Sequence, residues 1–322
     1  VNLRGDALNA RRFATNDTAT LLDGTPGVSF YTGGGVSSLP VINGLADDRL
    51  KITVDGMSIT SACPNHMNPA LSYIDPAALS QVNVYAGIVP VSQGGDSIGG
   101  AIAVKSISPA FAEPGQGLKT SGNLNAFYRS NGDVTGVGAR AAIATENFSI
   151  GYVGNTVDAG NYKDGNGKEV LASRYKVRNN AVNLAGKIGT DIFTLAIGWQ
   201  DIPYQGYPNQ SMDMTSNKSL SFNAGYNGFF DWGTLEARAF RQRVRHKMDV
   251  LDEKAKALGF TPINGSYMPM DTEAVDLGYS IVATAPLNEN HVARFGHEFH
   301  RYTLDDWWPP LVGSMGMEPN TF

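Results

Sequence analysis

The chain has 322 residues, and its 25 Lys and Arg against 30 Asp and Glu give a formal net charge of −5. This mild acidity and the lack of Lys/Arg runs exclude a typical nucleic-acid-binding protein. No stretch approaches the roughly 18 consecutive apolar residues of a transmembrane helix. Transmembrane β-strands are not excluded, because they carry apolar residues only at every second position.

The first part of the chain predicts a compact mixed α/β domain over residues 1–107. Short apolar runs such as Leu50–Val54 and Val82–Tyr85 predict strands, and turns rich in Gly and Pro separate them. The run Thr18–Leu22 predicts a short helix. Residues 108–117 contain several Pro and Gly and are predicted to be a linker.

From residue 118 onward the sequence alternates between apolar and polar residues many times. Leu220, Phe222, Ala224 and Tyr226, for example, would share one face of a strand. The alternation predicts about nine strands, over residues 118–129, 134–145, 147–157, 179–189, 191–201, 216–228, 232–246, 273–285 and 291–303. Each has about 11 residues or more, the length that a tilted strand needs to cross a bilayer.

Short and long connections alternate between these strands, and this asymmetry is typical of outer-membrane β-barrels. A soluble β-sandwich is the alternative, since its strands alternate as well. Bacterial barrels close with an even number of strands, so nine strands predict a piece of a longer chain. We therefore expect residues 118–322 to be the N-terminal part of an antiparallel transmembrane β-barrel. A barrel wide enough to hold a preceding domain points to about 22 strands.

Four motifs in the first domain resemble the plug of TonB-dependent outer-membrane receptors. They are Pro26–Val28, Ile42–Leu45, Val54–Gly56 and Ser97–Ile102, with Asn43 where the family commonly has Arg. The resemblance implies a bacterial outer-membrane location, contact with outer-membrane lipid and a receptor that imports its ligand into the periplasm. It also implies coupling to the TonB–ExbB–ExbD energy complex, although no TonB box is visible in the sequence.

The segment from Ser61 to Pro76 resembles the copper-receptor subfamily (OprC/NosA type). That subfamily carries a CxxxM motif in the plug and an HxM motif in the barrel. Here Cys63 and Met67 supply the first motif, and His246 and Met248 supply the second. The resemblance implies that these four residues bind the copper ion that the receptor transports.

The four residue types suit copper chemically. A thiolate and two thioethers are soft donors and imidazole is borderline, so the set favours copper, especially Cu(I), over Mg, Ca or Mn. Cys63 and Met67 are four apart and would share a face of one helical turn. His246 and Met248 are two apart and would share a face of an extended strand, near its predicted extracellular end at Arg245. The alternative for Cys63 is a small buried apolar residue.

The nine methionines add a second pattern. Three Met-x-Met pairs, and Met248, fall in segments predicted to be extracellular loops or their edges. The pairs are Met212 and Met214, Met268 and Met270, and Met315 and Met317. They are candidate accessory copper stations that pass the ion toward the main site. Adaptable packing between loops is the alternative.

Two other functions are open from the sequence. The first is a receptor for a siderophore or another metal complex, with Arg241, Arg243 and Arg245 lining its vestibule. The second is a β-rich adhesive or soluble protein without a transport role. We predict no enzyme, because no nucleophile–base pair is apparent and the helical HExxH spacing is missing around His297.

Overall fold

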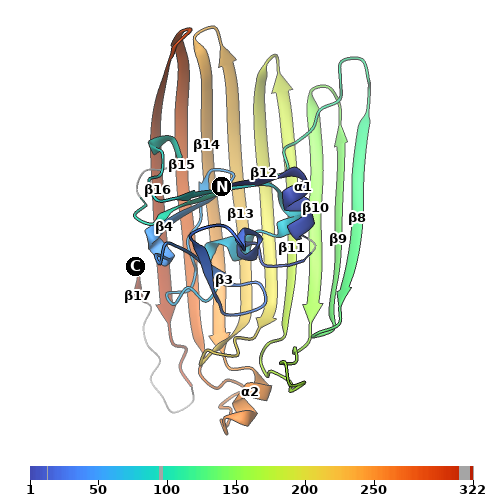
Figure 1. Cartoon of the computed structure of the whole chain (residues 1–322), viewed down its shortest axis with the longest axis vertical. Coiled ribbons are helices and arrows are strands. Elements are labelled where there is room, and N and C mark those ends of the chain that lie inside the picture. Colours follow the sequence, from blue (N-terminus) through green and yellow to red (C-terminus); the bar gives the residue numbers. More distant parts are fainter. Residues whose placement is uncertain (13, 94–96, 312–319, 322) are drawn as a thin grey trace.

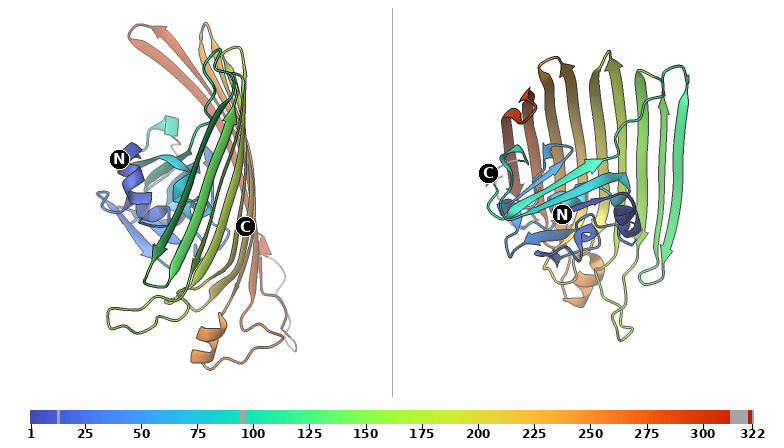
Figure 2. Two further views of the ribbon diagram at one scale, coloured as in Figure 1. Left: turned by 90° about the vertical axis from the view of Figure 1, so that its right-hand side faces the viewer. Right: turned by 45° about the horizontal axis from the view of Figure 1, so that its top comes forward.

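The structure is a computed structural model that describes residues 1–12, 14–93, 97–311 and 320–321. It has two parts, a small N-terminal domain and a tall antiparallel sheet (Figure 1). The N-terminal domain lies against one face of the tall sheet, as the view turned by 90° shows (Figure 2).

Five short strands form a mixed sheet in the N-terminal domain, in the order β1-β6-β7-β4-β5. Only β4 and β7 run parallel. The strands are β1 (Asn2–Arg4), β4 (Leu50–Val54), β5 (Met57–Ser58), β6 (Leu79–Ala86) and β7 (Gly100–Ser106), with a separate hairpin of β2 (Val28–Thr32) and β3 (Ser38–Ile42). The helices are α1 (Gly5–Arg12), η1 (Ala19–Leu22), η2 (Asp47–Arg49), η3 (Ala70–Tyr73), η4 (Pro76–Ala78) and η5 (Val91–Gln93). No helix of the described residues is long and apolar enough to cross a membrane.

The core of the N-terminal domain is apolar and includes a side chain from the tall sheet. Leu8, Leu71 and Ile102 are fully buried at its centre. Phe240 of the tall sheet belongs to the same cluster. Burial of an aromatic side chain stabilises by about 2 kcal/mol relative to exposure, so this contact holds the two parts together.

The tall sheet contains all nine predicted strands, each hydrogen-bonded antiparallel to its neighbours in sequence. They are β8 (Lys119–Arg129), β9 (Val134–Ala144), β10 (Phe148–Ala159), β11 (Tyr175–Ile188), β12 (Asp191–Gln205), β13 (Asp213–Phe230), β14 (Gly233–Asp249), β15 (Met270–Asn288) and β16 (His291–Trp307), followed by the short β17 (Asn320–Thr321). The sheet is not closed, and within the described residues its edges are β8 and β17. Closure at about 22 strands and the boundaries at residues 107 and 117 stay predictions.

Short turns lie at one end of the tall sheet and most long connections at the other, as predicted (Figure 1). The long connections include residues 160–174 and the segment that carries α2 (Asp252–Ala257). Several strands continue further toward this end than the sequence predicted. The strand end expected near Arg245 is wrong, because β14 continues to Asp249 and contains both His246 and Met248.

The side chains of β14 alternate strictly between two faces near the long-loop end. Even positions from Phe240 to Met248 are buried against the N-terminal domain, whereas odd positions from Arg241 to Lys247 are exposed. The pairing of β14 with β15 has no register shift, so no bulge interrupts this alternation. His246 and Met248 therefore share the face that the N-terminal domain covers, which we call the inner face.

The outward arginines contradict one expectation. Arg243 and Arg245 form ion pairs with Glu273, at 2.6 and 3.1 Å, on the side of the sheet away from the N-terminal domain. The predicted role of Arg241, Arg243 and Arg245 in lining a vestibule is wrong for this reason, since alternation turns all three outward.

Candidate metal centre

Cys63 and Met67 stand at the two ends of a tight turn in the N-terminal domain. The Cys63 carbonyl accepts a hydrogen bond from the amide of His66 at 2.9 Å, and His66 has a φ of +49°. The predicted helical turn is wrong, because a positive φ at His66 ends any helical path. The turn still buries Cys63, which is 1% exposed, and leaves Met67 half-buried.

His246 and Met248 lie fully buried on the inner face of β14, with exposures of 0% and 1%. Met214 of β13 and Met270 of β15 are the residues directly opposite Met248 on either side. Directly opposite residues have Cβ atoms about 5 Å apart, within reach of long side chains. The three thioethers therefore form one row across three strands, which we call the methionine row.

The Met-x-Met pairs were predicted in loops or at their edges, and Met214 and Met270 lie at the loop-side ends of β13 and β15. Met214 and Met270 are buried strand residues, with exposures of 0% and 5%. Met212 is partly buried and packs on the same cluster, and Met268 precedes β15 and is half-buried. Met315 and Met317 lie outside the described residues.

The turn and the methionine row meet in one continuous cluster of buried side chains. Cys63, Met214, Met248 and Met270 belong to this cluster, and Met67 packs against it. The cluster brings both sulfur atoms of the CxxxM motif together with the thioether of the HxM motif. Sequence reasoning named Met214 and Met270 only as accessory stations and did not place them in one buried cluster with the residues of the two motifs.

Two hydrogen bonds fix the Cys63 segment to the strands beside His246. Thr272 is the residue opposite His246 on β15, and its hydroxyl donates to the carbonyl of Ala62 at 2.6 Å. The hydroxyl of Tyr302 on β16 donates to the carbonyl of Ser61 at 2.6 Å. These contacts place the residue before Cys63 directly over the row that contains His246.

One ring nitrogen of His246 lies within hydrogen-bond distance of a partner, and the other does not. Its Nδ1 lies 3.2 Å from Oδ1 of Asn217, the residue opposite it on β13. Its Nε2 is buried and has no hydrogen-bond partner among the described residues. A buried polar atom without a partner is costly and rare in folded proteins, and a bound ion is one of its standard explanations.

Burial raises the pKa of the Cys63 thiol, and this is the largest influence on it. Hydrogen bonds from the amides of Met67 and Asn65 lower it, and the nearby carboxyl of Asp306 raises it further. The thiol is therefore protonated at neutral pH. A metal that binds Cys63 must displace this proton, because the thiolate is the ligand.

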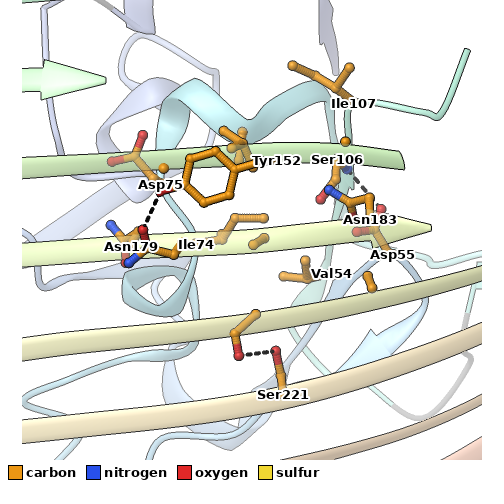
Figure 3. Close-up of a pocket in the computed structure, with 18 of the residues that line it drawn as sticks. Val54, Asp55, Ile74, Asp75, Ser106, Ile107, Tyr152, Asn179, Asn183 and Ser221 are labelled. Atoms are coloured by element: carbon orange, nitrogen blue, oxygen red, sulfur yellow. Dashed lines mark hydrogen bonds between the residues drawn. The ribbon is translucent and has the colours of Figure 1, made fainter. Parts of the chain in front are cut away.

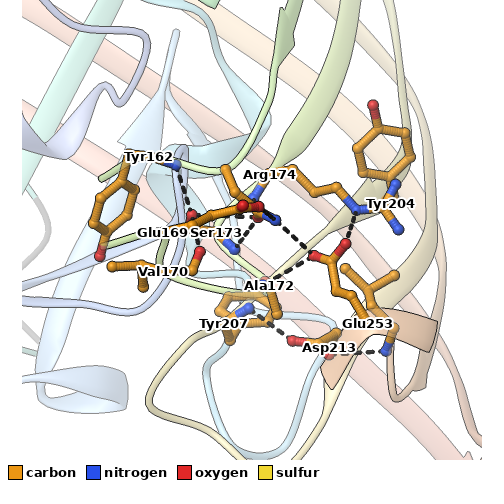
Figure 4. Close-up of polar contacts among 12 residues, drawn as sticks. Tyr162, Glu169, Val170, Ala172, Ser173, Arg174, Tyr204, Tyr207, Asp213 and Glu253 are labelled. Atoms are coloured by element: carbon orange, nitrogen blue, oxygen red, sulfur yellow. Dashed lines mark hydrogen bonds and ion pairs between the residues drawn. The ribbon is translucent and has the colours of Figure 1, made fainter. Parts of the chain in front are cut away.

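A polar network joins the loops at the long-loop end of the sheet (Figure 4), and one of its residues, Tyr207, belongs to the sulfur-containing cluster. Fully buried Tyr207 donates from its hydroxyl to the carbonyl of Met67 at 2.7 Å. Lys254 of α2 donates to the carbonyl of Tyr207 and to the carboxylate of Asp213, both at 2.9 Å. Glu253 accepts from the amide of Ala172 at 2.9 Å and so joins a third loop to the network.

The donor set of the site is dominated by sulfur. Among the described residues, no group of three or more His, Cys, Asp or Glu side chains is arranged to hold a metal ion. The sulfur cluster offers one thiol and several thioethers, and the imidazole of His246 lies on the same face of β14 as Met248, two residues away. Thiolate and thioether ligands select soft ions such as Cu(I) over hard ions that prefer oxygen.

Comparison with known proteins identifies the N-terminal domain. Residues 4–101 match the family described as "TonB-dependent Receptor Plug Domain". The chain carries a TonB-dependent receptor plug domain. Plug domains of this family occur in outer-membrane proteins of Gram-negative bacteria, and the related proteins reported below are named as transporters and receptors rather than enzymes. We refer to the N-terminal domain as the plug from here on.

One curated relative is the heme transporter BhuA of Brucella suis biovar 1 (strain 1330). The chain is 30% identical to it over 159 residues, which is 49% of this chain and 23% of BhuA. The chain thus covers less than a quarter of that relative.

Solved structures show the same fold over nearly the whole chain. The structure of the copper transporter OprC superposes with a TM-score of 0.82 and 21% identity, over 98% of this chain and 48% of that one. The hemophore receptor HasR of Serratia marcescens gives a TM-score of 0.74 and 17% identity, over 96% of this chain and 45% of that one. The FrpB iron transporter of Neisseria meningitidis gives 0.71 and 17%, over 94% and 48%. The chain spans about half the length of these proteins.

Proposed function

We propose that the chain is part of a TonB-dependent outer-membrane receptor that binds copper between plug and sheet and imports it to the periplasm. The proposed ligands are Cys63 and Met67 of the plug, with His246 and Met248 of β14. One observation carries the proposal: the buried, unpartnered Nε2 of His246 beside a cluster of buried sulfur atoms. The likeness to the fold of the copper transporter OprC supports it.

The methionine row extends this proposed site. Met214 and Met270 flank Met248, and their thioethers can exchange with one another as ligands of the ion while it enters the site. Met212 and Met268 lie nearer the loops and would act as earlier stations. For Met315 and Met317 the proposal rests on the sequence alone.

The proposed partners follow from the plug and from the outer face of the sheet. Leu220 and Phe222 are exposed on the face away from the plug, which suits contact with outer-membrane lipid. Copper that is held between plug and sheet can be released when the plug moves. We propose that the TonB–ExbB–ExbD complex supplies that movement.

The test is elemental analysis of the purified full-length receptor after loading with Cu(I) under reducing conditions. Cys63→Ala and Met248→Leu should lose stoichiometric copper while the barrel stays folded. Met57→Leu is the matched control, because Met57 is a buried plug methionine in a different core cluster. Full copper in the Cys63→Ala protein would contradict the proposal.

A receptor for heme or another iron complex is the second candidate. The similarity to the heme transporter BhuA favours it. In that case Cys63 and the methionines would serve packing, and the purified receptor would bind hemin but no stoichiometric copper. Loading the receptor with hemin and recording its absorption spectrum separates the two functions. The plug favours either over the adhesive or soluble alternative.

A further inference from the structure

Three amide side chains on adjacent strands of the sheet connect His246 with the plug. Asn217 of β13 donates from Nδ2 to Oε1 of Gln200 on β12, at 3.1 Å. Gln200 donates from Nε2 to Oδ1 of Asn179 on β11, at 2.8 Å. His246 lies at the other end, with Nδ1 3.2 Å from Oδ1 of Asn217. These residues form a continuous hydrogen-bonded chain along the inner face, which we call the amide chain.

The amide chain ends on two plug groups that accept hydrogen bonds. Nε2 of Gln200 also donates to the backbone carbonyl of Ser72, at 2.7 Å. Asn179 hydrogen-bonds the carboxyl of Asp75, as the dashed line in Figure 3 shows. Burial raises the pKa of Asp75 to about 6, so at pH 7 this carboxyl is mostly ionised and only accepts.

These acceptors fix the direction of every bond in the amide chain. A carbonyl oxygen cannot donate, so the Ser72 carbonyl requires the NH₂ group of Gln200 to face the plug. Oε1 of Gln200 then faces Asn217 and can only accept, so the NH₂ group of Asn217 must point toward it as the donor. Oδ1 of Asn217 is left to face His246, where it accepts the proton of Nδ1. Flipping either amide would bring two acceptors together.

The fixed direction determines the tautomer of His246. A neutral imidazole carries one N–H, and its other nitrogen has a free lone pair. With the proton on Nδ1, the lone pair is on Nε2, the nitrogen that is buried without a partner among the described residues. This is the tautomer that a metal bound through Nε2 requires, with the other ring nitrogen donating to an oxygen.

We propose that the seated plug sets the tautomer of His246 through Asn217 and Gln200, which act as positioning residues for the copper ligand. The inference rests on the proposed function and extends it to regulation of the same site. Hydrogen bonds in a chain polarise one another, so the plug acceptors also increase electron density at Nε2. When the plug moves away, the amide chain no longer has the Ser72 carbonyl and the Asp75 carboxylate as acceptors. Its amide side chains can then reorient. Plug movement would then weaken the sheet half of the site while it removes Cys63 and Met67.

The test uses variants of the full-length receptor in lipid vesicles. Asn217→Leu keeps the volume and removes the acceptor of His246, whereas Asn217→Asp keeps that acceptor, loses only the NH₂ group that donates to Oε1 of Gln200, and serves as the rescue of the tautomer. Asn223→Leu is the matched control. Asn223 lies on the same strand and face, is 6% exposed, and donates to a plug carbonyl, that of Asp55, at 3.2 Å. It has no hydrogen bond to the amide chain among the described contacts.

Two measurements are combined. Solid-state ¹⁵N spectra of metal-free, histidine-labelled receptor report the tautomer of His246, whose signal is the one lost in His246→Gln. Cu(I) affinity is measured by competition with a Cu(I) chelator. We expect the Nδ1–H tautomer in the native receptor and in Asn223→Leu. In Asn217→Leu we expect mixed tautomers and a Cu(I) affinity lower by about tenfold to a hundredfold. Asn217→Asp should restore the single tautomer.

The inference is overturned if metal-free His246 carries its proton on Nε2, or if Asn217→Leu changes neither the tautomer nor the affinity. It is also overturned if Asn223→Leu has the same effects as Asn217→Leu. Failure of the proposed function looks different. In that case His246→Gln binds Cu(I) as tightly as the native receptor, while the tautomer spectra still decide the role of the amide chain.

Discussion

Lys254 should hold the loops at the long-loop end of the sheet together, and Lys254→Met should open them. The Lys254 side chain is 10% exposed, and its ammonium binds the carbonyl of Tyr207 and the carboxylate of Asp213. Asp213 is 0% exposed and also accepts from the amides of Tyr207 and Leu251. Removing the ammonium leaves a buried carboxylate without its counter-charge, which costs about 3 kcal/mol or more.

This cost should appear as local opening of the loops. A change of about 3 kcal/mol multiplies the opening equilibrium roughly a hundredfold. Hydrogen exchange of the full-length receptor, followed by mass spectrometry, measures it in the peptides over residues 206–215 and 250–260. Because the Tyr207 hydroxyl bonds the Met67 carbonyl, bound Cu(I) should also dissociate faster from Lys254→Met.

Lys247→Met is the control. Lys247 pairs with Asp271 at 2.7 Å, but its side chain is 57% exposed, so the pair contributes about 1 kcal/mol or less. Adding Asp213→Asn to Lys254→Met should recover part of the protection, since the amide oxygen still accepts without a buried charge. Equal exchange in the Lys254→Met, Lys247→Met and native receptors would refute the reasoning.

Three further predictions concern the donors and the plug. Replacing Met214 and Met270 together by Leu keeps the packing volume but removes both thioethers. Cu(I) binding should then weaken about tenfold, or 1.4 kcal/mol, in a competition titration. An unchanged affinity would show that the methionine row serves packing alone. Cu(I) binding at pH 7 should release about one proton from Cys63, detectable by calorimetry in buffers of different ionisation enthalpy; an absence of proton release would exclude the thiolate as ligand. The pKa of Asp75 is raised from 3.8 to about 6, mainly by burial, so its contribution to plug stability is present below pH 4 and lost as the pH rises through 6. Between pH 5 and 7.5 the free energy of unfolding of the native plug should therefore fall by about 1 kcal/mol more than that of Asp75→Asn. Urea unfolding followed by hydrogen exchange measures both. Equal losses would contradict a raised pKa at Asp75.

Alternation in the sequence predicted all nine strands but ended several of them too early. In the middle of β13 the apolar residues point outward, as Leu220 and Phe222 do. Near the long-loop end of β14 the pattern reverses, with Phe240 and Val244 inward and Arg243 outward. The strand continues while its surroundings change, because the plug makes the inner face apolar there. A prediction that expects all apolar residues on one face of a strand interprets this switch of the apolar residues to the other face as the end of the strand.

The methionine row could not be predicted, because it depends on strand register. Met214 and Asn217 are three residues apart and would face opposite sides of a regular strand. A register shift between Met214 and Ser216 absorbs the odd residue, and both side chains then face inward. A slip of one residue turns a side chain to the other face, and spacing along one chain does not reveal it.

The CxxxM motif was informative for a reason other than the one expected. The spacing of Cys63 and Met67 fits a helical turn, but the chain between them contains Pro64 and Asn65 and turns back on itself. Both geometries bring residues four apart to one side. The positions of the two residues were therefore predictable, whereas the conformation that positions them was not.

A site with ligands on both plug and sheet couples metal binding to plug position in both directions. An ion that binds only while the plug is seated stabilises the seated state by about 2.7 kcal/mol at a hundred times its dissociation constant. Linkage requires that displacing the plug weakens the binding of the ion by the same free energy. In the proposed site the displaced plug takes Cys63 and Met67 with it, which leaves His246 and Met248 with no thiolate. The amide chain would add to this loss, because the Ser72 carbonyl that orients it leaves in the same movement. Release would then need no acid and no reductant, only the work that moves the plug.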